Sequence, residues 1–518
     1  MKFKLFAAFL LALFQVLAHA QHICPVIPQP SVSAEVPAFF VLNKGTAIVV
    51  DDESLLPAAR YLQKQLLSQN KIPLAIQQKA KVASIRLSLS KKAGAESYQL
   101  EMNAQEIRIS GAGNQAVFYG VVSLLQLTSS AKISPGSLLV KCWNIEDRPA
   151  YGWRGLMLDE SRHFFGVEKV KSILNWMAFY KLNRFHWHLT DEPAWRIEIK
   201  NYPRLALAGG IGSYTNPYTP AQFYTQEQVT EIVQYAAERH IMVIPEIDMP
   251  GHATAANNAY PQFSGGGSEK HPEFTFHPGK EGTYTYLTDI LREINALFPA
   301  RMLHLGGDEV SFGNDKWLAD PDVKSLMVRK QLKTVQEVEQ YFMQRMADSV
   351  YAMNAKLLAW DEVADMNLPK KETIVFWWRH DKPQQLQTTL DKGYQTVLCP
   401  RIPFYFDFVQ DSTHSLGRKW NKAYSGLKDV YDFKAAHLQG VNSSNQNQIL
   451  GVQANVWTET IADNYRLDYM LYPRIAALAE TAWSSNGKKN YTSFVQNLKQ
   501  HFLLYNNERI NYFNPFKK

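Results

Sequence analysis

From Gly152 onward, short apolar runs alternate with longer stretches in which apolar residues recur at helical spacing. The short runs predict buried strands, and the longer period predicts amphipathic helices. The expected strands are 155–158, 184–189, 242–245, 302–305, 357–360, 373–377, 395–398 and 451–456. Expected helices between them include 167–180, 226–238, 284–297, 335–353 and 383–390. Eight strands that alternate with helices predict an α/β fold, a (β/α)8 barrel.

The chain before this repeat has a different pattern. Residues 24–37 are rich in proline and predict an extended lead-in. Between 38 and 146, short strand patterns mix with helical ones, which predicts a small α+β accessory domain. The strands expected there are 46–50, 84–89, 98–102 and 107–110, and the helices are 58–67 and 114–127.

The end of the chain predicts two more helices, and the seventh crossover is irregular. Helical spacing covers 467–482 and 491–505, whereas 401–450 contains no long amphipathic helix. The resulting division is a signal peptide (1–20), an accessory domain (21–147), a catalytic barrel (148–484) and a C-terminal helical tail packed on the barrel (485–518).

The first twenty residues have the pattern of a secretory signal. Two lysines precede an apolar core at 5–17, and Ala-His-Ala at 18–20 is a small-x-small cleavage site. Cys24 raises the alternative of a lipid anchor, but residues 21–23 lack the small side chains of a lipid-modification site. We therefore expect an exported protein, periplasmic or extracellular, without a membrane anchor and with Gln21 at the mature N-terminus.

Charge and cysteine content exclude several classes. The formal net charge is +7 for the 518 residues and falls by two when the leader lysines are removed, which is too mild to predict nucleic-acid binding. Three cysteines cannot form a disulfide framework. The 12 tryptophans and 25 tyrosines are compatible both with core packing and with a sugar-binding pocket. The sequence predicts no cofactor and does not decide the oligomeric state.

The segment His-Leu-Gly-Gly-Asp-Glu at 304–309 carries the chemistry. In a regular strand, Asp308 and Glu309 would point to opposite faces, but a preceding Gly-Gly pair can turn both toward one site. Two close carboxylates resist ionising together, so the pKa of one should rise and keep a proton available near neutral pH. Such a proton suits general acid catalysis at a glycosidic oxygen. The alternative is a solvated turn after a strand.

Chemically useful side chains follow every expected barrel strand. In a barrel of this kind, catalytic groups lie at the C-terminal strand ends, where these side chains would meet on one rim. In strand order they are Asp159, Arg162, His163, His188, Asp191, Glu246, Asp248, His252, Asp308, Glu309, Trp360, Asp361, Trp378, Arg379, Tyr405, Asp407, Trp457 and Glu459.

Five segments together resemble family 20 glycoside hydrolases, the β-N-acetylhexosaminidases. They are RGLMLDESRHFF at 154–165, HWHLTD at 186–191, PEIDMPGH at 245–252, HLGGDE at 304–309 and WTE at 457–459. Their order and spacing cover essentially the whole mature chain, since members commonly carry a small α/β domain before the barrel. Gln453 is a departure, because many members have Glu there, and the match is weak over 401–450.

The resemblance implies an exo-acting enzyme that retains configuration without an enzyme nucleophile. The acetamido oxygen of the substrate would attack the anomeric carbon and form an oxazolinium intermediate, an exception to the two-carboxylate scheme. Glu309 would protonate the leaving oxygen and then activate water. Asp308 would hold the acetamido N–H and stabilise the developing positive charge, so we expect Asp308 ionised and Glu309 protonated.

The remaining roles also follow from the resemblance. Arg162 would grip sugar hydroxyls, and Tyr405 would hydrogen-bond the acetamido oxygen. Glu459 would accept from the outer hydroxyls, and Asp407 would assist at the acetamido end or at the hydroxyls. The remaining assignments are an aromatic box of Trp360, Trp378 and Trp457, and a relay of Asp191 and His252 that sets the protonation of Glu309. The implied substrate is a glycan or chitooligosaccharide with a terminal N-acetylglucosamine or N-acetylgalactosamine.

Three alternatives stay open. His186 and His188 face the same way on a strand and, with His252 and Asp191, could form a metal site, although the resemblance implies no metal. A sugar-binding barrel without catalysis would have no need of the adjacent acids. A member that releases a disaccharide differs in pocket depth, which depends on loops.

Gly265-Gly266-Gly267 lacks the Lys and Ser/Thr of a phosphate loop and predicts a flexible βα loop.

Overall fold

The computed structural model describes residues 23–79, 83–90, 94–414, 416–419, 421, 423–485, 487 and 489–517. The expected leader, 1–20, lies outside these residues. Contacts divide the chain into two compact units, one up to Asp147 with Thr492–Asn497, and one of Arg148–Tyr491 with Leu498–Lys518. Part of the segment expected as a single C-terminal tail therefore groups with the first unit.

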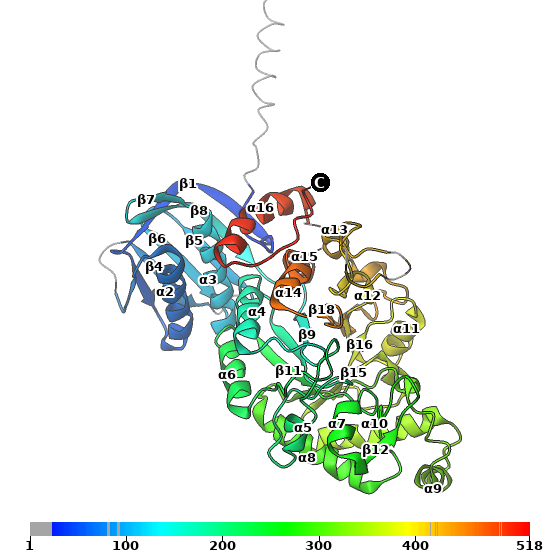
Figure 1. Ribbon diagram of the computed structural model, residues 1–518. Helices are drawn as coiled ribbons and strands as arrows, with labels where there is room; N and C mark the ends of the chain where they lie inside the picture. The colour runs from blue at the N-terminus through cyan, green and yellow to red at the C-terminus, as the bar shows by residue number, and fades with distance from the viewer. Residues whose placement is uncertain are drawn as a thin grey trace, which may run out of the picture. The chain divides into compact units, whose positions relative to one another are not determined.

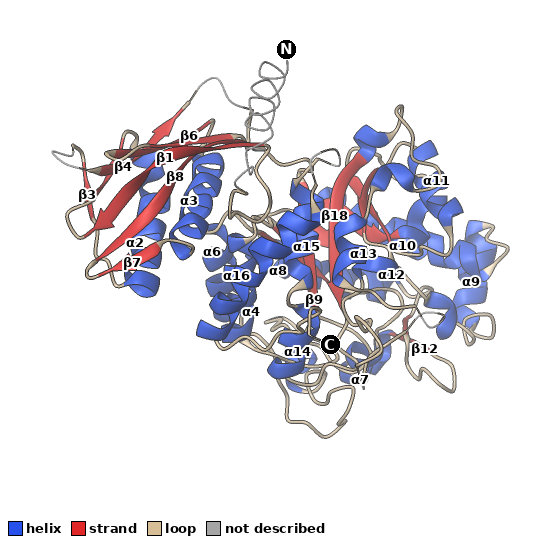
Figure 2. Ribbon diagram, turned by 90° about the horizontal axis from the view of Figure 1, so that it is seen from above, coloured by secondary structure: helices blue, strands red, loops and turns tan. Residues whose placement is uncertain are grey.

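The first unit is built on one mixed sheet with the strand order β1-β8-β5-β6-β4-β2-β3, and β7 pairs with β8. Helices α2 and α3 pack against each other and lie on the same face of this sheet (Figure 2). The elements are β1 (Val32–Asn43), β2 (Ala47–Val50), η1 (Glu53–Leu55), α2 (Leu56–Asn70), β3 (Ala75–Gln77), β4 (Ser84–Leu89), β5 (Tyr98–Met102), β6 (Glu106–Gly111), α3 (Asn114–Ser129), β7 (Lys132–Ser134) and β8 (Ser137–Asp147).

Strand β1 corrects the expectation of a proline-rich lead-in over 24–37. Residues from Val32 onward pair antiparallel with β8, and the register shifts between Glu35 and Phe39. Pro37, which cannot donate a hydrogen bond, lies within this irregularity, so a proline-containing segment can still join a sheet. Strand β8 itself, absent from the expected elements, supplies the long partner.

The second unit contains a closed parallel barrel with the order β10-β11-β14-β15-β16-β17-β18-β9, which confirms the (β/α)8 prediction (Figure 1). Pairing of β18 with β9, for example Asn455 with Met157, closes the ring. The strands are β9 (Trp153–Asp159), β10 (Arg184–His188), β11 (Met242–Glu246), β14 (Met302–His304), β15 (Lys356–Trp360), β16 (Thr373–Trp377), β17 (Gln395–Leu398) and β18 (Ile449–Val456). Each expected strand is present within two residues at either end.

Helices follow most of the strands. Two of them begin with capping boxes, Thr225 with Gln228 and Thr334 with Glu337, which satisfy free N–H groups of the first turn. The helices around the barrel are α4 (Val167–Phe179), α5 (Arg204–Leu207), α6 (Gln226–Ala237), α7 (Thr254–Ala259), α8 (Glu281–Leu297), α9 (Pro321–Lys330), α10 (Val335–Ala352), α11 (Pro383–Asp391), α12 (Arg401–Phe404), α13 (Leu427–Asp432), α14 (Asn464–Leu471), α15 (Arg474–Trp483) and α16 (Tyr491–Asn507).

The loops carry smaller elements that the sequence pattern did not reveal. A two-stranded ribbon, β12 (Ser264–Gly266) with β13 (Thr275–Phe276), lies in the loop after β11. Short helical turns are η2 (Pro261–Phe263), η3 (Val310–Phe312), η4 (Asp361–Asp365), η5 (Ala435–His437) and η6 (Gln446–Gln448). The 401–450 region contains only short helices, as expected.

The prediction of a single helix over 467–482 is wrong. Helix α14 ends at Leu471, Tyr472 is extended (φ −96°, ψ 138°), and α15 starts at Arg474. Pro473 causes the break, because proline lacks the N–H of a helical interior and disfavours helical backbone in the residue before it. The apolar spacing continues on both sides of the break, so periodicity alone could not show it.

Aromatic and aliphatic side chains of the barrel strands and of the loops that follow them pack together in a buried cluster. This cluster consists of Trp153, Ile244, Leu358, Trp360, Ile374, Phe376, Trp378, Val397, Cys399, Tyr405 and Phe408. The barrel interior is therefore a packed core and not an open channel. Within the described part of the chain, no helix has the length and apolar content needed to cross a bilayer.

Candidate active site

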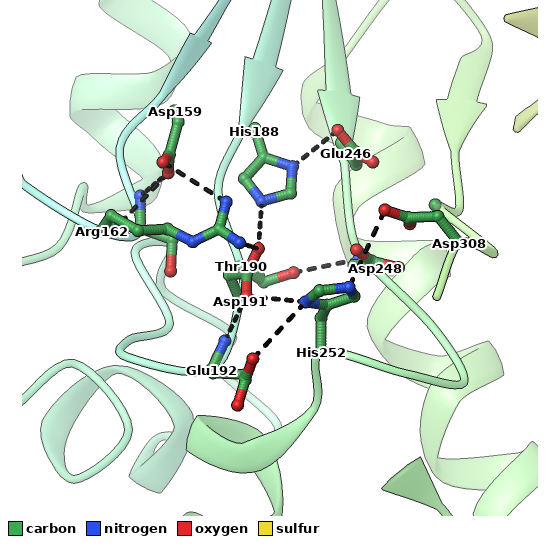
Figure 3. A network of polar contacts seen from close by, with 12 residues as sticks. Asp159, Arg162, His188, Thr190, Asp191, Glu192, Glu246, Asp248, His252 and Asp308 are labelled. Carbon is green, nitrogen blue, oxygen red and sulfur yellow. Dashed lines mark hydrogen bonds and ion pairs between the residues drawn. The ribbon is translucent and has the colours of Figure 1, made fainter. Parts of the chain in front are cut away.

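The side chains singled out by the strand-end argument meet at the C-terminal rim of the barrel. Strands β9, β10, β11 and β14 end at Asp159, His188, Glu246 and His304, and the polar residues that follow them face one another (Figure 3). The shared direction of parallel strands places these ends at one edge. A site assembled from many separate segments results.

The turn after β14 aims the two acidic residues. Gly306 and Gly307 have φ of +65° and +90°, and Glu309 has φ of +52°. A Cβ on Gly306 would lie 1.8 Å from Oδ1 of Asp248, so only glycine fits there. The backbone N–H of Gly307 donates to the same oxygen over 3.3 Å. The Gly-Gly pair therefore frees the backbone, as expected, and also makes room for a third carboxylate.

His252 lies between Asp308 and Asp191 (Figure 3). Its Nε2 is 3.6 Å from Oε2 of Glu309 and 3.8 Å from Oδ2 of Asp308, and its Nδ1 is 3.0 Å from Oδ1 of Asp191. Burial would lower the pKa of His252, but the carboxylates of Asp191 and Asp248 raise it well above its usual value. His252 is therefore a buried cation that faces both acids.

The acids differ in their environment. Asp308 is buried, and burial raises its pKa to about 7 against the opposing effect of His252, with Glu309 adding to the rise. The side chain of Glu309 is 33% exposed. The raised pKa therefore belongs to Asp308, the residue expected to be ionised, because burial disfavours its charged form. A positive charge close to Asp308 would favour its ionised form.

Asp248 is a third acid of the site that the resemblance left without a role. It is buried, and burial followed by the charge of Asp308 raises its pKa well above the usual value. Its position two residues after β11 was visible in the sequence as a strand-end carboxylate. Its approach to Asp308 was not, because it depends on the turn at Gly306.

Arg162 is held in one orientation before any ligand contacts it. Its Nη2 is 2.7 Å from Oδ2 of Asp191, its Nη1 is 3.4 Å from Oδ2 of Asp159, and its guanidinium lies 5.1 Å from the centre of the Trp457 ring. Burial would raise the pKa of Asp191, but Arg162 and His252 together hold it well below the usual range. Asp191 is therefore an anion that fixes both cations.

Glu246 is the centre of a buried polar cluster that sequence reasoning listed only as a strand end. Its oxygens lie 2.9 Å from Nε2 of His186, 2.7 Å from Nδ1 of His188 and 3.0 Å from Nδ1 of His304. The indole of Trp360 also donates to it over 2.9 Å. Burial would raise the pKa of Glu246, but the surrounding histidines hold it well below the usual value. Glu246 thus fixes one wall of the site.

The three tryptophans expected to form an aromatic box lie in one cluster with Tyr405. The rings of Trp360 and Trp457 are 6.0 Å apart, Tyr405 lies 6.1 Å from Trp457, and Tyr405 stacks on Trp378 at 6.4 Å with an 11° interplanar angle. The indole of Trp378 donates to Glu362 over 3.2 Å. Four aromatic side chains that end or follow four neighbouring strands therefore form one cluster at the rim that also carries the acids.

Asp407 and Glu459 lie together, and Arg418 joins them. Nη2 of Arg418 is 2.5 Å from Oε1 of Glu459, and its Nε is 3.8 Å from Oδ2 of Asp407. Burial and the charge of Glu459 raise the pKa of Asp407 to about 8, against Arg418. Arg418 lies in the irregular 401–450 region, where the resemblance assigned Tyr405 and Asp407 but gave no role to Arg418.

Groups of His, Asp and Glu close enough to hold a metal ion are present, among them His188 with Asp191 and Asp248. The nitrogens of His188 are, however, committed to protein partners: Nδ1 to Glu246 at 2.7 Å and Nε2 to Asp191 at 2.9 Å. A metal ion would have to replace these contacts, so the arrangement fits a hydrogen-bonded relay better than a ligand set.

Comparison with known proteins identifies the class. Residues 151–486 match the model described as glycosyl hydrolase family 20, catalytic domain, and residues 24–148 match glycosyl hydrolase family 20, domain 2. The chain belongs to this family and is a glycoside hydrolase of the β-N-acetylhexosaminidase type.

Individual relatives agree with the family match. The chain is 31% identical over 492 residues to a β-N-acetylhexosaminidase of Cellulomonas fimi, covering 92% of this chain and 93% of the relative. It is 33% identical over 510 residues to a β-hexosaminidase of Porphyromonas gingivalis, covering 95% of this chain but 64% of that longer protein.

A solved structure is similar in fold. The exo-β-N-acetylglucosaminidase of Vibrio harveyi, in complex with N-acetylglucosamine, has a TM-score of 0.89 and 29% identity, covering 96% of this chain and 79% of that one.

Proposed function

We propose that this protein is an exo-acting, retaining β-N-acetylhexosaminidase that releases terminal N-acetylglucosamine or N-acetylgalactosamine by substrate-assisted catalysis. The observation that carries the proposal is the position of Asp308 and Glu309, which both lie within 4 Å of the imidazole of His252 on a rim that also carries the aromatic cluster. An apolar box next to a carboxylate suits an acetamido group, which has a methyl end and an N–H end.

In this mechanism the acetamido oxygen attacks the anomeric carbon while Glu309 protonates the departing oxygen. The resulting oxazolinium carries a positive charge next to Asp308. That charge lowers the pKa of Asp308 below its value of about 7 in the free protein, so the carboxyl group is ionised. Water, deprotonated by Glu309, then opens the ring from the face the leaving group occupied. Configuration is retained by two inversions.

The binding residues follow the same division. Tyr405 donates to the acetamido oxygen and orients it for attack, while the box of Trp360, Trp378 and Trp457 fixes the methyl group. Arg162, already held by Asp191, donates to the outer hydroxyls, and Glu459 accepts from them. Asp407 assists at the acetamido end or at the hydroxyls. Pre-formed partners reduce the ordering needed on binding.

A set of sugar derivatives tests substrate assistance. A chromogenic N-acetyl-β-glucosaminide should be hydrolysed, the corresponding β-glucoside should be almost inert, and a thiazoline mimic of the intermediate should inhibit strongly. Equal turnover of the β-glucoside would contradict the proposal. A covalent sugar trapped on Asp308 with a fluorinated glycoside would replace the mechanism and leave the hydrolase class unchanged.

The terminal sugar and the length of the released unit need a panel. We propose release of single sugars from glycans or chitooligosaccharides, supported by 30% identity over 471 residues to a chitooligosaccharidolytic β-N-acetylglucosaminidase of Bombyx mori. Terminal N-acetylglucosamine, terminal N-acetylgalactosamine and a disaccharide glycoside should be compared. Exclusive turnover of the disaccharide glycoside would favour the alternative, a disaccharide-releasing enzyme, and binding without turnover of any member would favour a silent sugar-binding barrel.

We also propose that the protein acts after export, without a membrane anchor and without nucleic-acid partners. The leader pattern of residues 1–20 and the mild net charge support this proposal. Its substrate would then be met in the periplasm or outside the cell.

A further inference from the structure

Two aromatic rings form a stacked pair close to Glu309. Phe312 ends η3, and His271 lies in the loop between β12 and β13. Their ring centres are 5.5 Å apart with an interplanar angle of 27°. We call this pair the His271–Phe312 platform. It comes from the loops after β11 and β14, whereas the aromatic box follows β15 to β18, so the two lie on different sides of Glu309 around the rim.

The platform is fixed by its own loop. The hydroxyl of Ser268 donates to the carbonyl of Phe312 over 2.6 Å and accepts from the N–H of His271 over 3.2 Å. A Cβ on Gly267 would lie 2.0 Å from the carbonyl oxygen of His271, so the tight loop needs glycine there. The triglycine segment, expected to be a flexible loop, therefore allows a close backbone approach that fixes an aromatic pair.

The platform is connected to the acid on both sides. The N–H of Phe312 donates to the carbonyl of Glu309 over 2.9 Å. On the other side, Nδ1 of His271 is 3.0 Å from a carboxylate oxygen of Glu192, and Glu192 is 3.9 Å from Nδ1 of His252 (Figure 3). His252 returns to Glu309 at 3.6 Å. The contacts therefore form a closed ring, which runs from Glu309 through His252 and Glu192 to the His271–Phe312 platform and back to Glu309.

The platform is accessible although it is fixed. Phe312 is 45% exposed, and the side chains of His271 and Glu192 are 33% and 26% exposed. Buried Phe274 supports it from within, with ring centres 5.3 Å from His271 and 4.8 Å from His252. An ordered aromatic surface with a carboxylate at its edge offers both features a sugar ring can use, an apolar face and a hydrogen-bond acceptor.

We propose that the His271–Phe312 platform, with Glu192 at its edge, binds the first sugar of the leaving group. The inference rests on the proposed function, because Glu309 must lie next to the oxygen that joins the released sugar to the rest of the glycan. The sugar beyond that oxygen meets the surface next to Glu309, where its apolar face stacks on Phe312. Glu192 accepts from its hydroxyls. The substrate class is therefore a glycan extended by a second sugar.

Two substrates with the same terminal sugar separate this role from catalysis. N-acetyl-β-glucosaminyl fluoride has no leaving-group ring, whereas a disaccharide with terminal β-linked N-acetylglucosamine has one. Phe312→Ala should lower kcat/KM for the disaccharide by roughly five- to tenfold, the scale of one lost aromatic stacking contact. The same variant should hydrolyse the fluoride at the wild-type rate within about twofold, and Phe312→Trp should restore disaccharide hydrolysis.

Leu318→Ala is the matched control. Leu318 is 51% exposed in the segment that follows η3, similar to Phe312, but lies outside the stacked pair. The Leu318→Ala variant should hydrolyse both substrates at the wild-type rate. Equal losses on both substrates in Phe312→Ala, or an undisturbed disaccharide rate, would overturn the assignment. If the wild-type protein hydrolysed neither substrate, the proposed function itself would fail, so the two failures are distinguishable.

Discussion

At the scale of single residues, the site is organised by alternating charges. Asp159 and Asp191 hold Arg162, Asp191 also holds His252, and His252 faces Asp308 and Glu309. Each buried ion therefore has an opposite charge beside it, which is the condition under which burial is tolerated. Changing one member should alter the protonation of the next.

Replacement of Glu309 tests the general acid directly. Glu309→Gln keeps the size of the side chain but cannot transfer a proton, so kcat for a poor leaving group should fall by roughly 10² or more. Steady-state kinetics with a glycan substrate measures this. An activated aryl leaving group needs less protonation and should show a smaller loss. Near-normal turnover of the glycan would contradict the assignment.

Asp308 should limit activity on the acid side. If the ionised carboxylate stabilises the oxazolinium, kcat/KM should fall as pH decreases through about 7, the raised pKa of Asp308 in the free protein. Asp308→Asn should lose on the order of 3 kcal/mol of transition-state stabilisation and with it this acid limb. A pH profile that stays flat down to pH 5 in the wild type would argue against this role.

The same substitution should stabilise the fold at neutral and alkaline pH. A carboxyl group whose folded pKa lies above its unfolded value binds more protons when folded, so stability falls as pH rises from about 4 to about 7. Asp308→Asn removes this cost and should raise Tm at pH 8, with little change at pH 4. Thermal unfolding at both pH values is the measurement, and a lower Tm at pH 8 would contradict the burial argument.

At the scale of elements, the turn after β14 makes a sharp comparison possible. Gly306 and Gly307 both have positive φ, so alanine at either position costs backbone strain of about 1 kcal/mol. A Cβ on Gly307 would meet the flexible end of Met343 at 3.0 Å and Val363 at an ordinary 3.7 Å, whereas one on Gly306 would overlap Asp248 at 1.8 Å.

Gly306→Ala should therefore lower the free energy of unfolding more than Gly307→Ala and should abolish activity. Gly307→Ala serves as the control for strain alone. Urea unfolding and turnover of a chromogenic substrate measure the two effects. Equal losses of stability would show that Asp248 moves aside without cost.

The sequence predicts elements well where the pattern has one meaning. All eight barrel strands are mostly buried short runs whose observed bounds lie within two residues of the predicted ones, and the acids at their ends can be assigned from position. Residues that act through space were not accessible in this way. Glu246 gathers three histidines and an indole from other strands, and Arg418 reaches Glu459 from an irregular segment. The break at Pro473 was missed because apolar spacing continues across it.

At the scale of the whole molecule, export is the property that the chain's first residues predict. Mass spectrometry of protein recovered from the periplasm or the medium should show a mature chain that begins at Gln21 or its neighbour, without a lipid on Cys24. An uncleaved leader or a diacylglycerol adduct on Cys24 would contradict the leader assignment.

The fixed guanidinium of Arg162 has a consequence for turnover. Because two carboxylates and the Trp457 ring hold it in place, little side-chain freedom is lost when a sugar arrives, and the released monosaccharide can use the same contacts as the substrate did. We therefore expect the released monosaccharide to bind again and inhibit the enzyme. Hydrolysis in a closed volume should slow as free N-acetylhexosamine accumulates, and an enzyme of this design works best where uptake or diffusion removes the sugar.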